Sequence, residues 1–486
     1  MADRPLVAVV GGGITGLATA WYLRTGAGPV RPEVVVVEAT SRLGGKLRTE
    51  EAAGVAVEAG PDTFLARVPW AVDLARELGL ADDLIPPATS AALVYHDGRL
   101  RPLPRRTVFG VPTTVGGLLA ARGLLSGAGT ARAALDLVLP RTKLGDDPSV
   151  SEVVSRRLGR EALDRLVEPL VGGIHAGRAD RLSLRSTARP LGDAARHRSL
   201  LLGVRAGVAE AGRGERAGPL FLGVNGGMER LVDRLVSSLE GVPLRTGVSV
   251  QALVPEGERW RLACAPRPDV VADAVVVAVP AFAATPLLAP VAPDAAKELE
   301  QLRYASVVTA TLGYRPESVR HPLDASGFLV ARAMGGLATA CTFSTTKWPD
   351  LRRSGLVLLR ASAGRDGDDR ALTLDDGDLV DRLHRELAPV LGLTAAPVAQ
   401  RVDRWPRSFP QYEPGHEERV SRAESALVAH PGIFLAGAAY RGLGVAACVQ
   451  QAETTAGGVM AHLSHRPSRC GGGNMGPDPR NHRQNG

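Results

Sequence analysis

Cysteine is scarce in this chain of 486 residues, and the four that occur stand far apart, at Cys264, Cys341, Cys448 and Cys470. Their spacing provides neither a C-x-x-C redox pair nor a zinc-binding cluster, and it excludes a small disulfide-stapled scaffold. Unpaired thiols are typical of a reducing compartment. The composition therefore predicts a cytoplasmic protein.

Long apolar segments free of helix breakers are missing as well. The longest uncharged stretch, residues 274–293, contains four prolines, which would repeatedly break a membrane-spanning helix. The first residues lead directly into an apolar strand, without a charged leader before a cleavable apolar core. We therefore expect no integral membrane segment and no export signal. Residues 466–486 lack any periodicity and predict a disordered tail.

Aromatic residues make up only 4% of the chain, and no block of five or six consecutive cations occurs, so a nucleic-acid partner is not expected. Lysine is nearly absent, because all but four of the 58 cationic residues are arginine. A bias toward GC-rich codons explains most of this excess. Since guanidinium groups pair well with carboxylates and phosphates, the excess and the net charge of +7 are also compatible with an acidic ligand.

The first forty residues carry a nucleotide-binding pattern. An apolar run at residues 6–10, typical of a buried parallel strand, ends in Gly11-Gly12-Gly13-Ile14-Thr15-Gly16, which matches G-x-G-x-x-G. Gly11 permits a tight turn, Gly13 lets the backbone approach a pyrophosphate, and Gly16 lets a helix pack on the strand. A second strand, at residues 34–37, ends in Glu38, where a carboxylate would accept hydrogen bonds from ribose hydroxyls. Together these features predict a bound dinucleotide.

A second motif follows Glu38 and narrows the choice of dinucleotide. After Ala39, the segment Arg42-Leu43-Gly44-Gly45-Lys46 gives an acid followed by R-x-G-G. This pattern resembles the flavoprotein superfamily of amine oxidases, carotenoid desaturases and porphyrinogen oxidases. In that superfamily the arginine and the paired glycines wrap the FAD diphosphate. The resemblance therefore implies FAD, and not NAD, as the cofactor.

The same resemblance implies further FAD contacts along the chain. A glycine turn after residues 54–59 would lie beside the flavin ring, and Val248 would lie on the adenine side. Near the C-terminus, a strand at residues 432–438 precedes a helix whose N-terminus would stabilise the negative charge of reduced flavin. The expected cofactor-binding residues are Gly11, Gly12, Gly13, Ile14, Thr15, Gly16, Glu38, Ala39, Arg42, Gly44, Gly45, Lys46, Gly60, Pro61, Asp62, Thr63, Val248, Trp405, Ala438, Leu443, Gly444 and Val445.

One departure from the superfamily pattern narrows the choice of family within it. In the general pattern an acidic residue follows the glycine at 437, whereas this chain has Ala438-Ala439-Tyr440. The segment G-A-A-Y-x-G-x-G-V is similar to the porphyrinogen oxidase branch. Residues 60–65 resemble that branch's G-P-D-S-F-L, residues 168–177 resemble E-P-L-x-S-G-I-Y-A-G, and residues 405–412 match as well. The resemblance covers residues 5–463 and is to the soluble Gram-positive type.

That resemblance implies an FAD-dependent oxidoreductase that converts coproporphyrinogen III to coproporphyrin III in haem biosynthesis. Oxygen would accept the electrons in three cycles, releasing three molecules of H2O2. Protoporphyrinogen IX is the alternative substrate, and a flavin amine oxidase is a more distant alternative, although Tyr440 lacks the second aromatic residue expected there. A carotenoid desaturase and a non-catalytic FAD-binding protein also remain open. No metal site is expected, and the sequence does not determine the oligomeric state.

Few residues outside the cofactor motifs stand out as substrate contacts. His175 and Arg67 are candidates, the first as a proton acceptor or packing residue, the second as a propionate partner. Lys347 precedes a Trp-Pro pair and is interpreted as a surface-turn residue. We expect one or two members of a cationic belt to line a substrate entrance, the belt being Arg178, Arg181, Arg185, Arg189, Arg196 and Arg198.

The predicted fold is an α/β FAD-binding Rossmann-type domain combined with an antiparallel substrate-binding sheet and an inserted helical domain. Because the nucleotide motifs recur at both ends and in the middle, the FAD-binding domain must be discontinuous. We assign residues 1–60, 220–290 and 400–465 to it. Residues 90–205 are expected to form the helical domain, and residues 295–400 with 61–89 the substrate-binding domain.

Overall fold

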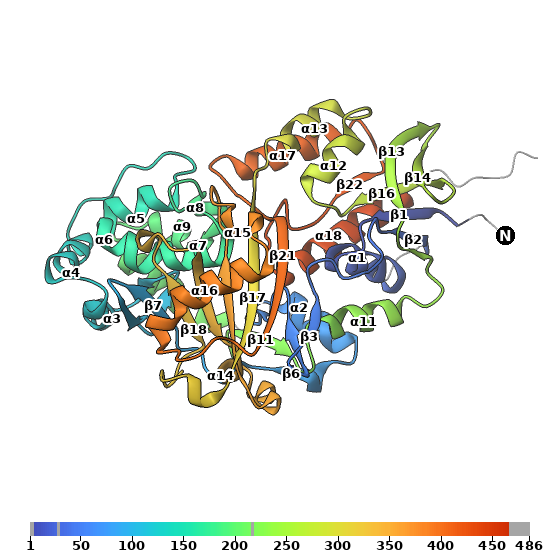
Figure 1. Cartoon of the computed structure of the whole chain (residues 1–486). Coiled ribbons are helices and arrows are strands. Elements are labelled where there is room, and N and C mark those ends of the chain that lie inside the picture. The colour runs from blue at the N-terminus through green and yellow to red at the C-terminus, as the bar shows by residue number, and fades with distance from the viewer. Residues whose placement is uncertain (1–3, 27–29, 215–217, 466–486) are drawn as a thin grey trace, which may run out of the picture.

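A computed structural model describes residues 4–26, 30–214 and 218–465 (Figure 1). The tail predicted at residues 466–486 lies outside the described residues. Three regions follow one another across the molecule, with a large sheet between a helical region on one side and a nucleotide-binding sheet on the other (Figure 1).

The nucleotide-binding sheet has five parallel strands in the order β12-β2-β1-β16-β22. Their bounds are β1 Leu6–Val10, β2 Glu33–Val37, β12 Leu244–Arg245, β16 Ala274–Val277 and β22 Ile433–Leu435. Val7 and Val9 face one hydrophobic core, while Ala8 and Val10 face a second. A sheet covered on both faces explains why its strands read as continuous apolar runs. The predicted Rossmann-type fold is confirmed.

Helices cover one face of this sheet. The helix that follows the glycine motif, α1 (Ile14–Thr25), packs beside the C-terminal helix α18 (Val445–Ser464). Two further helices complete this layer, α2 (Pro69–Glu77) and α11 (Glu229–Ser238). The other face carries a three-stranded sheet and three helices: β13 (Ser249–Glu256), β14 (Arg259–Ala265), β15 (Val270–Ala272), α12 (Ala281–Leu288), α13 (Pro293–Glu300) and α17 (His416–Leu427).

The large sheet has seven strands in the order β21-β17-β20-β19-β18-β7-β8. They are β7 Leu93–His96, β8 Arg99–Pro102, β17 Tyr304–Tyr314, β18 Gly327–Val330, β19 Ala338–Phe343, β20 Val357–Ala363 and β21 Ala399–Pro410. The helix α16 (Asp376–Leu391) packs its apolar side chains on it. Five of its strand pairs are antiparallel, as expected, but β18 and β7 run parallel. The sheet is therefore mixed, which corrects the purely antiparallel prediction.

The helical region begins later than expected. Residues 93–102 form a hairpin of the large sheet, and β9 (Thr107–Val108) and β10 (Val111–Pro112) follow it. Asp97 and Gly98 both have positive φ, at 49° and 71°, which is the backbone of a two-residue hairpin turn. The Asp-Gly pair is the local signal that should have predicted strands here. Helices then run from α3 to α10: α3 Val115–Ala120, α4 Gly127–Ala134, α5 Val150–Leu158, α6 Arg160–Ala162, α7 Glu168–His175, α8 Leu184–Thr187, α9 Arg189–Ala195 and α10 Leu200–Gly214.

Two other assignments differ from the expected division. Residues 399–410 belong to the large sheet, because β21 pairs with β17 along its length. Residues 69–77 belong to the nucleotide-binding region, because Val72 and Leu74 of α2 pack in the core beneath α18. The chain therefore crosses between the two sheets more often than the repeated nucleotide motifs suggest. In the described ranges, no helix combines the length and apolar character that crossing a bilayer requires.

Candidate functional site: a dinucleotide cradle

The glycine motif forms the turn between β1 and α1, and its glycines have different physical roles. A Cβ on Gly16 would lie 1.9 Å from the carbonyl oxygen of Gly11, so this position holds the helix against the strand. A Cβ on Gly11, whose φ is +111°, would lie 2.7 Å from the oxygen of Ala278. Gly13 is the N-cap of α1, and a Cβ there would meet nothing within 4 Å. The motif therefore presents a helix N-terminus, opened by Ile14 and Thr15, to free space.

Glu38 lies directly over this turn. Its carboxylate accepts hydrogen bonds from the Gly12 N–H at 2.7 Å and from the Thr40 N–H and hydroxyl at 2.8 and 2.7 Å. A Cβ on Gly12 would lie 3.0 Å from that of Glu38, so only glycine admits the carboxylate so close. Ala39 continues the chain, and Val248 lies alongside, because its N–H donates to the Glu38 carbonyl at 3.0 Å. The expected adenosine end of the site is thus one compact group of residues.

The R-x-G-G loop packs against the glycine turn. Gly44 donates its N–H to the Gly12 carbonyl at 2.8 Å, and a Cβ on Gly45 would lie 3.2 Å from the Gly13 Cα. Arg42 donates to the carbonyls of Gly45 and Leu47 and forms an ion pair with Glu229 at 2.7 Å. In this structure the arginine therefore holds the loop in shape. Its direct contact with a diphosphate stays a prediction.

Lys46 projects from the same loop toward the large sheet. Its ammonium group donates to the Ser408 carbonyl on β21, and burial lowers its pKa. The Cys448 thiol, in the first turn of α18, is close enough to raise that pKa in part. Lys46 is thus a cation placed near the start of α18, where negative charge on a bound flavin would be stabilised.

The glycine turn that follows β4 (Val55–Glu58) lies against Lys46. A Cβ on Gly60 would be 1.9 Å from the Lys46 carbonyl oxygen, so no other residue fits. The Trp405 indole donates to the Ala59 carbonyl at 2.9 Å, and Arg360 donates to the Gly60 carbonyl at 2.6 Å. Pro61 and Thr63 complete the turn, and the Thr63 hydroxyl lies 3.4 Å from an Asp62 carboxylate oxygen.

Lys347 is not a surface residue, and that interpretation is wrong. Its ammonium lies 2.7 Å from the Asp62 carboxylate, and the two side chains are only 16% and 18% exposed. Burial raises the pKa of Asp62, but the adjacent Lys347 and Arg360 outweigh it and hold the pKa below its ordinary value. The ion pair ties the glycine turn to α14 (Ser344–Lys347).

The C-terminal turn closes the far end of the cradle. Ala438 follows β22, and Leu443 and Gly444 lead into α18, with Gly444 as N-cap before Val445. Gly437 is buried, yet a Cβ on it would meet no described atom within 4 Å. Gly444 is exposed, and a Cβ on it would also meet no described atom within 4 Å. A glycine that is buried beside a void indicates a cavity shaped for something other than protein.

The two proposed substrate contacts are placed very differently. His175, the last residue of α7, is 5% exposed, and its Nε2 lies 3.3 Å from the Thr187 carbonyl oxygen. Burial lowers its pKa to about 4, so it is neutral at physiological pH. Arg67 is exposed just after β5 (Phe64–Leu65). Both substrate roles stay predictions, and the burial of His175 favours packing.

Several residues of the site carried no sequence signal for their role. Tyr412 and Gln451 hydrogen-bond to the C-terminal turn, and Arg360 hydrogen-bonds to the Gly60 turn. Tyr412 and Arg360 each act through the side chain across 26 and 300 positions, whereas Gln451 contacts the turn from nine positions away. A motif of neighbouring residues cannot show such a contact.

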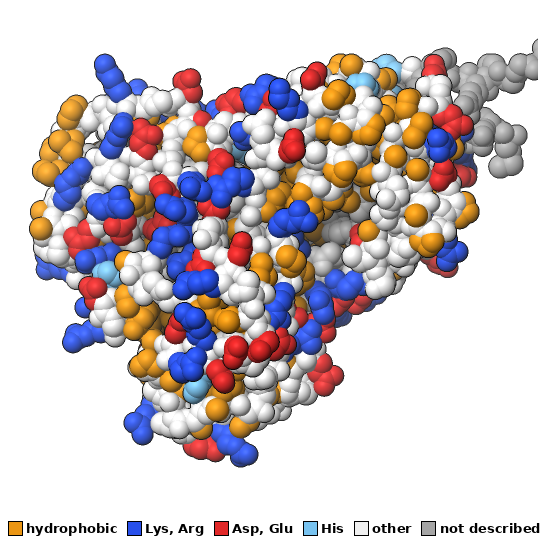
Figure 2. Space-filling model, turned by 45° about the horizontal axis from the view of Figure 1, so that its top comes forward, with side chains coloured by type: hydrophobic (Ala, Val, Ile, Leu, Met, Phe, Trp, Pro, Cys, Tyr) orange, Lys and Arg blue, Asp and Glu red, His pale blue; other side chains and the backbone are white. Residues whose placement is uncertain are grey.

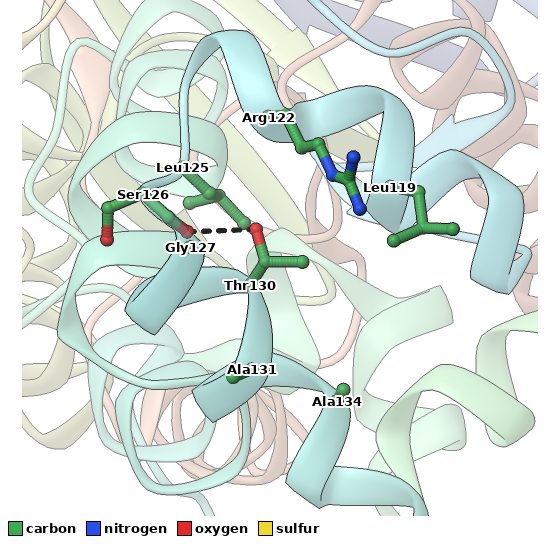
Figure 3. A pocket seen from close by; sticks show the side chains of 8 residues that line it. All are labelled: Leu119, Arg122, Leu125, Ser126, Gly127, Thr130, Ala131 and Ala134. Carbon is green, nitrogen blue, oxygen red and sulfur yellow. Dashed lines mark hydrogen bonds between the residues drawn. The ribbon is translucent and has the colours of Figure 1, made fainter.

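One cavity lies outside this cradle. It has a volume of about 540 Å³ and sits in the helical region between α3 and α4. Figure 3 shows Arg122 and Thr130 among mainly apolar neighbours, and the full lining is Leu119, Arg122, Leu125, Ser126, Gly127, Thr130, Ala131 and Ala134. None of these residues belongs to the nucleotide cradle, and their side chains offer no group for redox chemistry.

The residues of the cradle fit an extended dinucleotide. A carboxylate marks one end, helix N-termini open at Gly13 and Gly444, and open space adjoins three glycines. Among the described residues no group of His, Cys, Asp and Glu could hold a metal ion. The fold and the cradle together define an FAD-dependent oxidoreductase.

Comparisons with known proteins identify the family. The model of the flavin-containing amine oxidoreductases matches residues 14–460. Coproporphyrinogen III oxidase of Bacillus subtilis is 34% identical over 465 residues, covering 94% of this chain and 98% of the relative. The enzyme of that name from Mycobacterium tuberculosis is 36% identical over 467 residues, covering 95% and 98%. The chain belongs to the flavin-containing amine oxidoreductases and, within them, to the family of the bacterial coproporphyrinogen III oxidases. Its cofactor is FAD.

Solved structures agree with this placement. A crystal structure assigned as protoporphyrinogen oxidase from Exiguobacterium has a TM-score of 0.83 and 32% identity, covering 95% of this chain and 100% of that one. Cyclohexylamine oxidase from Brevibacterium oxydans has a TM-score of 0.67 and 18% identity, which shows the shared fold alone.

Proposed function

We propose that this protein oxidises coproporphyrinogen III to coproporphyrin III in haem biosynthesis, with bound FAD as the electron acceptor. The observation that carries the proposal is the match to enzymes of that name across nearly their whole length. The reaction removes six hydrogens. Three molecules of O2 would each take two of them, so that three molecules of H2O2 leave per porphyrin formed.

FAD supplies the two-electron chemistry of each cycle. The chain's own residues bind and orient it: Glu38 at the ribose, the start of α1 at the diphosphate, and the Gly60 turn and the start of α18 at the flavin. Lys46 and the helix N-terminus at Gly444 would favour negative charge on the flavin. We assign no proton-transferring residue, because buried His175 faces the Thr187 carbonyl.

The second candidate substrate is protoporphyrinogen IX. It is supported by the chloroplastic protoporphyrinogen oxidase of rice, which is 29% identical over 487 residues. The higher identity to the bacterial coproporphyrinogen III oxidases favours the first substrate. We further propose a cytoplasmic location, which the unpaired thiols of Cys264, Cys341 and Cys448 support.

The deciding experiment compares the two porphyrinogens at matched concentration under air, following porphyrin fluorescence and H2O2 together. We expect a yellow protein, faster oxidation of coproporphyrinogen III, and three H2O2 per porphyrin. Protein stripped of FAD serves as control and should regain activity when FAD is added. Failure to oxidise either compound would disprove the reaction, while faster oxidation of protoporphyrinogen IX would reverse the preference. Fractionation of lysed cells tests the location, and activity that only detergent releases from the membranes would contradict it.

A further inference from the structure

Charged side chains crowd the junction between the end of α7 and the large sheet. Figure 2 shows cationic side chains gathered over the middle of one face, with acidic side chains between them. At this junction the acidic residues Glu168, Asp366 and Asp368 lie close to the arginines Arg181, Arg303, Arg332, Arg365 and Arg370.

Each of these acids already has its own arginine. Glu168 pairs with Arg332 at 3.2 Å. Asp366 pairs with Arg303 at 2.7 Å and, more loosely, with Arg181 at 3.7 Å. Asp368 accepts two hydrogen bonds from Arg370, at 2.8 and 2.7 Å. These pairs use the available carboxylates.

Arg365 is the arginine of this group with which none of these three acids forms an ion pair. Its backbone bonds to that of Asp368, but its guanidinium has no hydrogen bond or ion pair within the described part of the chain. The side chain is half-buried, and burial together with neighbouring Arg332 lowers its pKa. The carboxylates of Asp368 and Glu168 raise that pKa in part, although each is already paired with another arginine. A partly desolvated cation without a directly paired anion is unfavourable. The site is therefore electrostatically incomplete.

Arg365 and Arg332 line the same cavity, of about 20 Å³. Its walls include Gly172 and Gly173 of α7 and Val330 of β18. A water molecule needs about 10–15 Å³ measured in this way, so the cavity has room for about one water molecule, whose place one oxygen of a carboxylate would take. Glu168 also lines it, but its charge is opposed by Arg332.

Paired strands connect the segment of Arg365 with the flavin turn. A Cβ on Gly364, next to Arg365, would lie 2.6 Å from the Ser306 oxygen on β17. The following residue, Val307, pairs with Trp405, whose indole reaches the Ala59 carbonyl before Gly60. A ligand lying along these strands could meet both the flavin turn and Arg365.

We propose that Arg365, assisted by Arg332, binds a carboxylate of the substrate. This inference rests on the proposed function, because that substrate is a tetracarboxylate. The carboxylate would complete the charge balance of the cluster and accept the two parallel N–H bonds of a guanidinium fork. Arg365 is thus a specificity-determining residue, and it takes no part in the redox step.

The test uses the FAD-loaded protein and three variants. In Arg365→Gln we expect binding of coproporphyrin III, measured by fluorescence quenching, to weaken about 10- to 100-fold. KM for the porphyrinogen should rise similarly, with kcat nearly unchanged. Arg365→Lys keeps the charge but loses the guanidinium fork, so its porphyrin affinity and KM should lie between those of wild type and Arg365→Gln. Arg422→Gln, an exposed arginine paired with Glu298, is the matched control and should behave as wild type.

Thermal midpoints complete the test. Because the Arg365 guanidinium makes no hydrogen bond or ion pair with the described residues, Arg365→Gln should melt at or above the wild-type temperature, whereas loss of a structural arginine would lower it. Unchanged porphyrin binding and KM in Arg365→Gln, or a lowered midpoint, would overturn the proposal. Wild-type protein that binds coproporphyrin III without oxidising coproporphyrinogen III would count against the proposed function and leave this site standing.

Discussion

The Tyr412 hydroxyl lies 2.6 Å from the Ala438 carbonyl oxygen and donates a hydrogen bond to it. The same hydroxyl accepts a bond from the Gly442 N–H at 3.0 Å. One phenol thus spans the turn that precedes α18. His416 stacks on the Tyr412 ring at 4.1 Å and binds the Tyr440 carbonyl. Residues that follow β21 therefore set the shape of the turn at the flavin end of the cradle.

Removing that hydroxyl should weaken cofactor binding. Tyr412→Phe leaves the Ala438 carbonyl and the Gly442 N–H without their partner, and we expect FAD affinity to fall about 5- to 150-fold. Titration of the FAD-free protein with FAD measures this affinity. Tyr314→Phe is the matched control, since Tyr314 ends β17 of the large sheet and its hydroxyl lies 3.1 Å from His384 of α16, away from the cradle. Equal affinities in wild type and Tyr412→Phe would show that the turn needs no such support.

Alanine substitutions in the glycine motif should separate an effect on folding from an effect on cofactor binding. In Gly16→Ala the new methyl would lie 1.9 Å from the Gly11 carbonyl oxygen, so the fold itself should be destabilised. In Gly13→Ala the methyl meets no protein atom and enters the space assigned to the diphosphate. We expect Gly13→Ala to keep the thermal midpoint of the FAD-free protein and to lose FAD affinity at least tenfold. A normal FAD affinity in Gly13→Ala would place the diphosphate elsewhere.

Glu38 should anchor the ribose. Glu38→Ala removes acceptors for two hydroxyls, at about 1–3 kcal/mol, which corresponds to about 5- to 150-fold in FAD affinity. The carboxylate also accepts hydrogen bonds from Thr40, so Thr40→Val is the control that removes the hydroxyl contact and keeps the N–H contact and the carboxylate. If both variants lost affinity equally, the effect of Glu38 would be local structure and not ribose binding.

His416 makes stability depend on pH. Burial lowers its pKa from 6.5 to about 4, so between these values the unfolded chain takes up a proton that the folded chain does not. The contribution of His416 to the free energy of unfolding therefore falls as pH falls through this window, by about 3 kcal/mol in total. Urea unfolding at several pH values should show that the free energy of unfolding falls less on acidification in His416→Gln than in wild type. The exposed His465 provides the control, His465→Gln, which should follow wild type. Identical pH curves for wild type and His416→Gln would contradict the assignment.

Local sequence patterns predicted the nucleotide-binding half well. The run at residues 6–10, the glycines and Glu38 lie in one continuous unit, β1-α1-β2, whose contacts are mostly close in sequence. Their chemistry is also constrained, since Gly16 admits no side chain beside Gly11. Motifs of this kind can be recognised because geometry leaves few alternatives.

The rest depends on contacts that no local pattern reveals. Lys347 meets Asp62 across 285 positions, and the Trp-Pro pair beside it suggested only a surface turn. The hairpin at residues 93–102 was assigned to the helical domain because its role depends on β18, more than 200 positions later. Domain limits failed for the same reason, as β21 pairs with β17 and not with its neighbours in sequence.

The distribution of the five parallel strands along the chain also governs when the protein can form. Strand β1 begins at residue 6 and β22 at residue 433, so at about 5–20 residues per second the ribosome needs roughly 20–85 s to deliver the last strand after the first. During that time α1 lacks the cover of α18, and from the synthesis of β16 until that of β22 the edge of β16 has no partner. An unpaired edge of this kind is prone to aggregation. Cofactor capture is consequently a late event, and FAD meets a nearly finished chain.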